Sequence, residues 1–396
     1  MKYDFNTLID RSNQSSDKWL LMKQTNPAVQ AGIPPLSVAD MDMKHPPQFL
    51  EGMKQYIEKT VMGYTAPSDE YFDAVIKWMN RRHNWKIEKE WILITSGIIP
   101  AIHNLIQAFT EKGDGVIVLT PVYYPFYRAI ETNGRKIVDS SLNNTTGEYR
   151  IDFDDLEKKA KDPKNKLILF CSPHNPVGRV WTRAELERVG QICLEHNVQI
   201  ISDEIHFDLI MPGNQHTVFA SISKELMDNV ITCTAPSKSF NLAGMMTSNI
   251  IIPNKEKRGM LHKQLEKNGA EVWSPIGFEA CRLSYELCED WLDELILHIQ
   301  HNYEALSSFV EENLPKVKLY PLQGTYLAWL DFSYLGLTNE KLEHLMTQEA
   351  QVFFDEGYIF GENGSGFERI NIACPTNVMI EAMERIKSAI EKLSTN

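Results

Sequence analysis

Short apolar runs rich in β-branched residues alternate with amphipathic segments along residues 91–253 of the 396-residue chain, and this alternation constrains the fold most strongly. Continuous apolar runs are typical of strands buried on both faces, and helical segments between them are typical of crossover connections. In the segment 182–197, for example, Leu186, Val189 and Ile192 recur at helical spacing. The pattern therefore predicts an α/β fold, with a mainly parallel sheet covered by helices on both faces. The expected strands are Trp91–Thr95, Gly115–Thr120, Lys166–Ser172, Val198–Asp203, Asn229–Thr234 and Ser248–Pro253.

The pattern changes after about residue 285, where longer helical segments are separated by short strand patterns. We group the first 45 residues with this C-terminal part of the chain. The sequence thus predicts a large domain over residues 46–288 and a smaller α+β domain made of residues 1–45 together with 289–396. The expected elements of the small domain are helices over Asp290–Asn313, Asn339–Glu349 and Asn377–Leu393, and strands over Val317–Tyr320, Tyr326–Asp331 and Arg369–Ile372.

The composition excludes several classes of function. The chain has 40 Lys and Arg against 53 Asp and Glu, a formal net charge of −13, which argues against binding to the phosphate backbone of nucleic acids. No apolar run approaches the roughly 20 residues that span a bilayer, and the polar N-terminus lacks the apolar core of a signal peptide. The six cysteines are scattered, as expected of reduced thiols, and the histidines show no metal-ligand spacing. We expect a cytoplasmic protein without a metal, a membrane partner or a nucleic-acid partner.

Two turns at the ends of predicted strands have features of a binding site. The segment 94–100 reads as strand, tight turn at Gly97 and helix, with Pro100 in the first helical turn. Free N–H groups at such a helix start form an anion site, although many strand-to-helix turns contain glycine without this role. In the segment 172–178, prolines on both sides would hold Asn175 rigidly at a strand end, where a plain turn is the alternative.

Charged residues follow two further strands of the predicted sheet. Asp203 and Glu204 end one apolar strand, and a charge there costs stability unless it is paired, so it marks a site more often than a surface; a helix cap is the alternative. Lys238 follows the next strand, where it is either a solvated charge or, if desolvated, an amine of lowered pKa that can form a Schiff base. Ligands of parallel sheets bind beyond the carboxyl ends of the strands, so these residues are expected to meet.

Asn175, Asp203 and Lys238, in this order, resemble the signature of the fold-type I enzymes that use pyridoxal 5′-phosphate (PLP), the class I and II aspartate-aminotransferase superfamily. The resemblance covers essentially the whole chain and extends to Gln323–Tyr326 and Arg369–Pro375. It implies a large, mainly parallel seven-stranded sheet domain between helices and a smaller α+β domain. Within the superfamily, the chain further resembles the C–S lyases of the MalY/PatB type, which include cystathionine β-lyases and cysteine desulfhydrases. The segments that carry this closer resemblance are Val38–Asp42, Gly63–Thr65, Pro121–Tyr123, Pro173–Pro176 and Asp203–His206.

The resemblance implies roles for the residues around the cofactor ring. Lys238 is expected to bind PLP covalently and later to move the Cα proton of the substrate. Asp203 is expected to keep the pyridine nitrogen protonated, so that the ring accepts electrons. Asn175 is expected to donate to the phenolate oxygen and to touch the substrate carboxylate, and Tyr123 to stack on the ring unless it is a core aromatic. His206 stands where many aminotransferases carry a tyrosine, which favours the lyase branch and leaves its own role open.

Other residues are expected at the phosphate. The backbone N–H groups of Ile98 and Ile99 and the hydroxyl of Ser237 would bind it within one subunit. Tyr64 resembles the tyrosine that reaches the phosphate of the neighbouring subunit, which implies an obligate homodimer with shared sites. Tyr64 and Tyr123 are also candidates for assisting the leaving thiol.

Arg369 and Ala39 complete the predicted site on the substrate side. Arg369 resembles the arginine that grips the substrate α-carboxylate, and Ala39 belongs to a segment expected to contact substrate. Two positions depart from the pattern of the superfamily: Ala235 replaces a serine that often binds phosphate, and Met246 replaces a phosphate-binding arginine.

The resemblance favours PLP-dependent β-elimination of cystathionine or a related cysteine S-conjugate, which gives a thiol, pyruvate and ammonia. An aminotransferase is the first alternative, because it shares every step up to removal of the Cα proton. A regulatory binding protein on the same fold is the second. The joint presence of Lys238, Asp203, Asn175 and Arg369 argues against a purely non-catalytic role.

Overall fold

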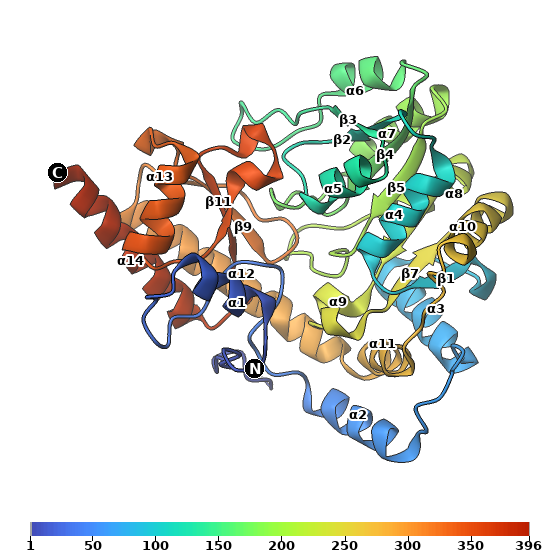
Figure 1. Ribbon diagram of the computed structural model, residues 1–396, viewed down its shortest axis with the longest axis horizontal. Helices are drawn as coiled ribbons and strands as arrows, with labels where there is room; N and C mark the ends of the chain where they lie inside the picture. The colour runs from blue at the N-terminus through green and yellow to red at the C-terminus, as the bar shows by residue number, and fades with distance from the viewer. Residues whose placement is uncertain (1, 396) are drawn as a thin grey trace.

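A seven-stranded sheet forms the centre of the computed structural model, which describes residues 2–395 (Figure 1). The strands are β1 (Ile92–Thr95), β2 (Gly115–Val118), β3 (Lys136–Asp139), β4 (Asn165–Cys171), β5 (Gln199–Asp203), β6 (Val230–Thr234) and β7 (Ser248–Ile251). They lie in the order β1-β7-β6-β5-β4-β2-β3, and all run parallel except β7, which is antiparallel to both of its neighbours. The predicted α/β fold with a mainly parallel sheet is confirmed.

The described chain contains fourteen α-helices, some of which cover this sheet while others belong to the N-terminal and C-terminal parts of the chain. They are α1 (Asp17–Thr25), α2 (Pro47–Lys59), α3 (Asp69–His83), α4 (Ile98–Phe109), α5 (Pro125–Thr132), α6 (Phe153–Ala160), α7 (Arg183–Glu195), α8 (Lys224–Asn229), α9 (Pro236–Ser239), α10 (Lys255–Lys267), α11 (Pro275–Leu287), α12 (Glu289–Asn313), α13 (Asn339–His344) and α14 (Thr376–Thr395). Local sequence determines where several of these helices begin. At α7, for example, the Thr182 side chain and Glu185 form a reciprocal capping box.

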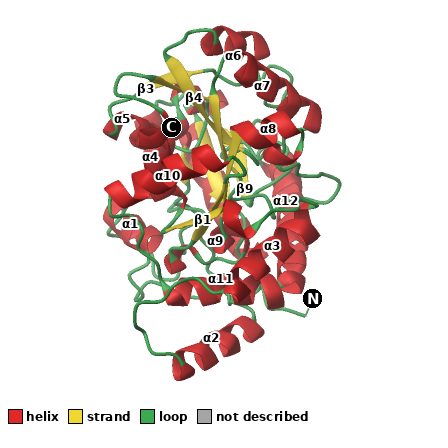
Figure 2. Ribbon diagram, turned by 90° about the vertical axis from the view of Figure 1, so that its right-hand side faces the viewer, coloured by secondary structure: helices red, strands yellow, loops and turns green. Residues whose placement is uncertain are grey.

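Both faces of the sheet are buried under helices, as its continuous apolar strands require (Figure 2). Successive side chains of a strand point to opposite faces. In β4, Leu167 and Leu169 join a core with α4, α5 and α10, whereas Ile168 and Phe170 join the core that contains residues of α3, α7 and α8. The sheet is therefore fixed from both sides, and its strand ends form a rigid base for a site.

A second, four-stranded antiparallel sheet lies beside the first (Figure 1). Its strands are β8 (Lys318–Leu319), β9 (Leu327–Asp331), β10 (Asp355–Glu356) and β11 (Phe367–Asn371), in the order β10-β11-β9-β8. The N-terminal part of the chain packs here: Trp19 and Met22 of α1 contact Phe353, whose carbonyl accepts from the Leu36 N–H at 2.9 Å. The domain boundaries at residues 45 and 288 stay a prediction.

The expected strands of the large sheet agree with the observed ones to within two residues. The residue pattern missed β3 and β10. β3 is an edge strand whose two apolar residues lie between the exposed Lys136 and Asp139, and β10 consists of two acidic residues, so neither shows a continuous apolar run. The segment Asn339–Glu349, predicted as one helix, forms the α-helix α13 up to His344 and a π-helical turn over Leu345–Glu349.

Two further findings concern membrane-spanning helices and the cysteines. Within residues 2–395, no helix combines the length and apolar character needed to cross a membrane. The six cysteines are all buried and free, as their scattered positions predicted.

Candidate active site

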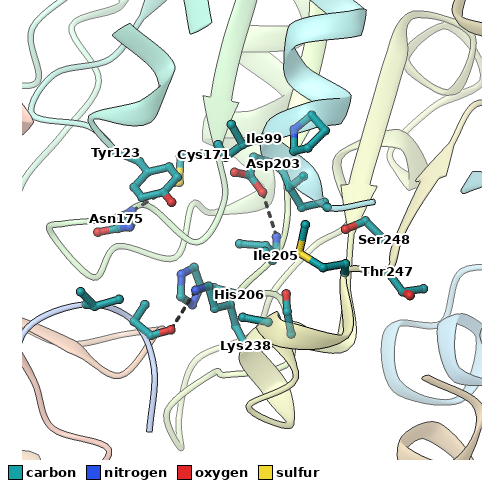
Figure 3. Close-up of a pocket in the computed structure, with 18 of the residues that line it drawn as sticks. Ile99, Tyr123, Cys171, Asn175, Asp203, Ile205, His206, Lys238, Thr247 and Ser248 are labelled. Atoms are coloured by element: carbon teal, nitrogen blue, oxygen red, sulfur yellow. Dashed lines mark hydrogen bonds between the residues drawn. The ribbon is translucent and has the colours of Figure 1, made fainter. Parts of the chain in front are cut away.

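A cavity of about 230 Å³ lies at the carboxyl ends of the parallel strands, where the sequence predicted a site. Its walls come from segments far apart in the chain: the ends of β1, β4, β5 and β6, the start of β7, the segment at Val38 and Ala39, and β11 of the small sheet. Figure 3 shows Tyr123, Asn175 and Asp203 around this cavity together with His206 and Lys238.

Lys238 enters the cavity from α9, the single turn of helix that follows β6. Pro236 occupies the first turn of α9, where a missing N–H costs nothing. The Lys238 amine donates to the Ala39 carbonyl at 2.8 Å. Burial lowers the pKa of this amine to about 8, with Arg369 acting in the same direction and Asp40 opposing it. Near neutral pH, Lys238 thus has a fraction of the neutral amine that an exposed lysine lacks.

Asp203 ends β5 at the floor of the cavity and is fully buried. Burial raises the pKa of its carboxyl to about 7. Two weaker influences lower the pKa: the Ile205 N–H, which donates to the carboxylate at 3.2 Å, and the nearby charge of Lys238. A buried carboxyl of this kind becomes a stable anion only if a cation approaches it. Asp203 is therefore poised to receive a cationic or N–H-bearing group.

His206 lies three residues beyond the end of β5 and lines the same cavity. Burial lowers the pKa of its imidazole well below the usual range, and the charges of Lys238 and Arg369 lower it further, so the ring is neutral at physiological pH. Its Nδ1 is buried without a hydrogen-bond partner. An unsatisfied buried polar atom is costly, and here it faces a cavity that could hold its partner.

Arg369 reaches the cavity from β11 and is almost completely buried. Its Nη1 donates to the Asn175 Oδ1 at 2.7 Å, and its Nη2 donates to Asp355 Oδ2 at 2.6 Å. The guanidinium also lies 4.7 Å from the centre of the Phe360 ring, and its Nε is buried without a partner. Because Arg369 donates to the oxygen of the Asn175 amide, the NH₂ group of that amide remains to donate elsewhere.

The N-terminus of α4 forms one end of the cavity. Gly97 precedes it with a φ of +130°, a conformation that favours glycine, and no side chain caps the helix. Ile98 and Ile99 line the cavity at the first positions of this helix, where N–H groups and the helix dipole attract anions. The hydroxyl-bearing residues Ser237 and Ser248 line the same cavity.

All the predicted site residues except Tyr64 line this one cavity. Tyr64 lies in the loop between α2 and α3 and is completely exposed. Tyr124 and Thr247 also line the cavity, although no sequence motif predicts a role for them. Each directly follows a residue that was singled out, Tyr123 and Met246, so adjacency was the available signal. Asp355, which holds Arg369, was missed because its strand is only two residues long.

Comparison with known proteins agrees with this geometry. The family model described as "Aminotransferase class I and II" matches residues 34–386. The chain is 42% identical to cystathionine beta-lyase PatB of Bacillus subtilis, over 90% of this chain and 92% of that protein. It is 29% identical to protein MalY of Escherichia coli, over 98% and 99% of the two chains. Its structure matches that of cystalysin from Treponema denticola, which contains pyridoxal 5′-phosphate, with a TM-score of 0.98 and 49% identity over 99% and 100% of the two chains. The chain belongs to the class I and II aminotransferase family.

Proposed function

We propose that this protein is a PLP-dependent C–S lyase that eliminates the β-substituent of cystathionine or a related cysteine S-conjugate. The products are a thiol, pyruvate and ammonia. The observation that carries the proposal is the placement of the Lys238 amine, the Asp203 carboxyl and the Arg369 guanidinium around one buried cavity. The names of the related proteins above favour elimination over amino-group transfer.

The residues around the cavity fit PLP at both of its ends. The uncapped start of α4, with Ile98 and Ile99, suits the phosphate, and the hydroxyl of Ser237 can add to it. The buried carboxyl of Asp203, whose pKa is raised by burial, suits a protonated ring nitrogen, which would restore the anion. The unsatisfied Nδ1 of His206 offers one more polar contact.

In this assignment Lys238 both attaches the cofactor and handles the substrate proton. When bound, PLP supplies an electron sink that accepts the charge left at the substrate Cα. Burial lowers the pKa of the Lys238 amine to about 8. A fraction of this amine is therefore already neutral near neutral pH and can accept the Cα proton.

Arg369 and Asn175 would fix the substrate by its α-carboxylate, and Ala39 lies beside them at the cavity wall. Tyr123 would donate a hydrogen bond to the departing sulfur: burial raises the pKa of its hydroxyl, which keeps the O–H in place but disfavours complete transfer of its proton.

We further propose a homodimer with shared sites. Apolar side chains on α2 and the loop after it are exposed, including Ile57, Val61 and Met62 with exposed fractions of 53%, 88% and 48%. Exposed apolar groups gathered in one region favour an interface, and Tyr64 lies in the same loop, so a second copy could receive it. A cytoplasmic location is proposed from the six buried, free cysteines.

The test is to incubate the PLP-loaded protein with L-cystathionine and to assay pyruvate without an added oxo-acid. Sustained pyruvate release, absent in Lys238→Ala, is the expected result. Bleaching of the cofactor absorbance that an added oxo-acid restores, without pyruvate, would instead identify an aminotransferase. No response at all would exclude cystathionine as the substrate.

A further inference from the structure

Asp355 is a buried carboxylate that lies behind Arg369 and outside the cavity wall. The two residues are direct neighbours across the antiparallel pair of β10 and β11, and the Nη2 of Arg369 donates to Asp355 Oδ2 at 2.6 Å. The same Oδ2 accepts the backbone N–H of Val38 at 2.9 Å. One carboxylate oxygen thus joins the guanidinium to a separate segment of the cavity wall.

The segment at Val38 needs such support, because Val38 has a φ of +56°. A β-branched residue in the left-handed region is strained and persists only where its surroundings hold it. Besides the contact from its N–H to Asp355, the Val38 carbonyl accepts from Asn371 Nδ2 at 2.8 Å, and the same Nδ2 donates to the Asp40 carbonyl at 2.9 Å. Side chains of the small sheet therefore fix both peptide groups of Val38.

The held segment extends to the catalytic lysine. Ala39 follows Val38, and its carbonyl accepts from the Lys238 amine at 2.8 Å. The position of this carbonyl depends on the peptide that Asp355 and Asn371 hold. Asp355 is therefore placed to keep Arg369, the Val38 peptide and Ala39 in a fixed relation to one another.

We propose that Asp355 is a positioning residue that builds the α-carboxylate subsite, acting through Arg369 and the Val38 peptide; this rests on the proposed role of Arg369 as carboxylate anchor. Arg369 has five N–H bonds, and Asp355 and Asn175 each engage one of them. The two contacts fix the plane of the guanidinium, so that its remaining donors meet a carboxylate without first reorienting. The subsite is thus specific for substrates that carry a free α-carboxylate.

The experiment measures binding rather than turnover. L-Alanine and L-alaninamide are titrated into the PLP-loaded protein, and dissociation constants are taken from the change in visible absorbance. L-Alanine has no leaving group on Cβ, so the result does not depend on β-elimination. We expect Asp355→Ala to raise the dissociation constant of L-alanine at least tenfold and that of L-alaninamide less than twofold. Asp355→Asn, which keeps an oxygen for both donors, should recover most of the L-alanine affinity.

Glu356→Ala is the matched control, because Glu356 is the next residue of β10, pairs with Glu368 rather than with Arg369, and should leave both constants unchanged. If Asp355→Ala does not fold, Asp355→Ser, whose hydroxyl is too short to reach Arg369, replaces it. Equal losses of affinity for the two ligands would mean that Asp355 and Arg369 form only a structural ion pair. Tighter L-alanine binding would mean that the Asp355 carboxylate repels the carboxylate of the ligand. Either result overturns the proposal. A wild-type protein that binds L-alanine but releases no pyruvate from L-cystathionine or from other cysteine S-conjugates would refute the lyase function and leave this test intact.

Discussion

Replacing Asp203 by Asn tests the electrostatics of the site most directly. The side chain is fully buried at the end of β5, and burial raises the pKa of its carboxyl to about 7, against 3.8 in an unfolded chain. Asparagine has nearly the same shape and carries no charge. In protein stripped of cofactor, the substitution should therefore remove a cost of burying charge, whereas in the loaded protein it should remove the partner of the ring nitrogen.

The magnitude follows from proton linkage. Because the folded-state pKa of Asp203 is the higher one, the folded chain keeps the proton between pH 3.8 and about pH 7, whereas the unfolded chain releases it. The contribution of this group to the free energy of unfolding therefore falls as the pH rises through that window, by about 1.4 kcal/mol per pH unit. From pH 5 to pH 7 the wild type should lose about 2 kcal/mol through this group, because the folded-state carboxyl is already half ionised at pH 7, and Asp203→Asn should not.

The assay is urea unfolding of the cofactor-free proteins at pH 5 and pH 7, followed by circular dichroism. Ile201→Val is the control, since it removes one buried methyl group of the same strand and should cost about 1 kcal/mol equally at both pH values. In the loaded protein, Asp203→Asn should lose most of its turnover. A stability difference between Asp203→Asn and wild type that stays the same at both pH values would refute the assigned burial of charge.

Three further predictions concern the other site residues. Lys238→Ala should abolish turnover and the visible absorbance of the bound cofactor, and an unchanged spectrum would rule out Lys238 as its attachment point. Arg369→Ala should lower kcat/KM roughly tenfold or more, because hydrogen bonds to a charged group contribute about 1.5–3 kcal/mol. The same substitution should lower the free energy of unfolding by about 3–5 kcal/mol, because it leaves Asp355 buried without its partner. Wild-type kinetics would show that Arg369 does not bind the substrate. Mixing Lys238→Ala with Tyr64→Ala should restore activity that neither variant has alone, since a mixed dimer with shared sites has one intact site; no gain after subunit exchange would contradict sharing.

The sequence by itself determined the central sheet and the residues at its strand ends. Buried parallel strands must be apolar throughout, so their positions are visible in the pattern. Asp203 is the last residue of β5, and Asn175 and Lys238 lie in the turns that follow β4 and β6. Their meeting at one edge follows from the parallel direction of the strands. The site residues carried by these strands were therefore accessible from local sequence and from the family resemblance.

Only the tertiary structure decided how the small sheet completes the site. Arg369 meets Asn175 across 194 residues of sequence, and Ala39 meets Lys238 across 199. Asp355 gave no signal, because its strand is short and acidic and its importance lies in joining Arg369 to the Val38 peptide. Local sequence sets which elements form, but the packing of distant elements sets which side chains meet, and contacts of this kind leave no periodicity in a single sequence.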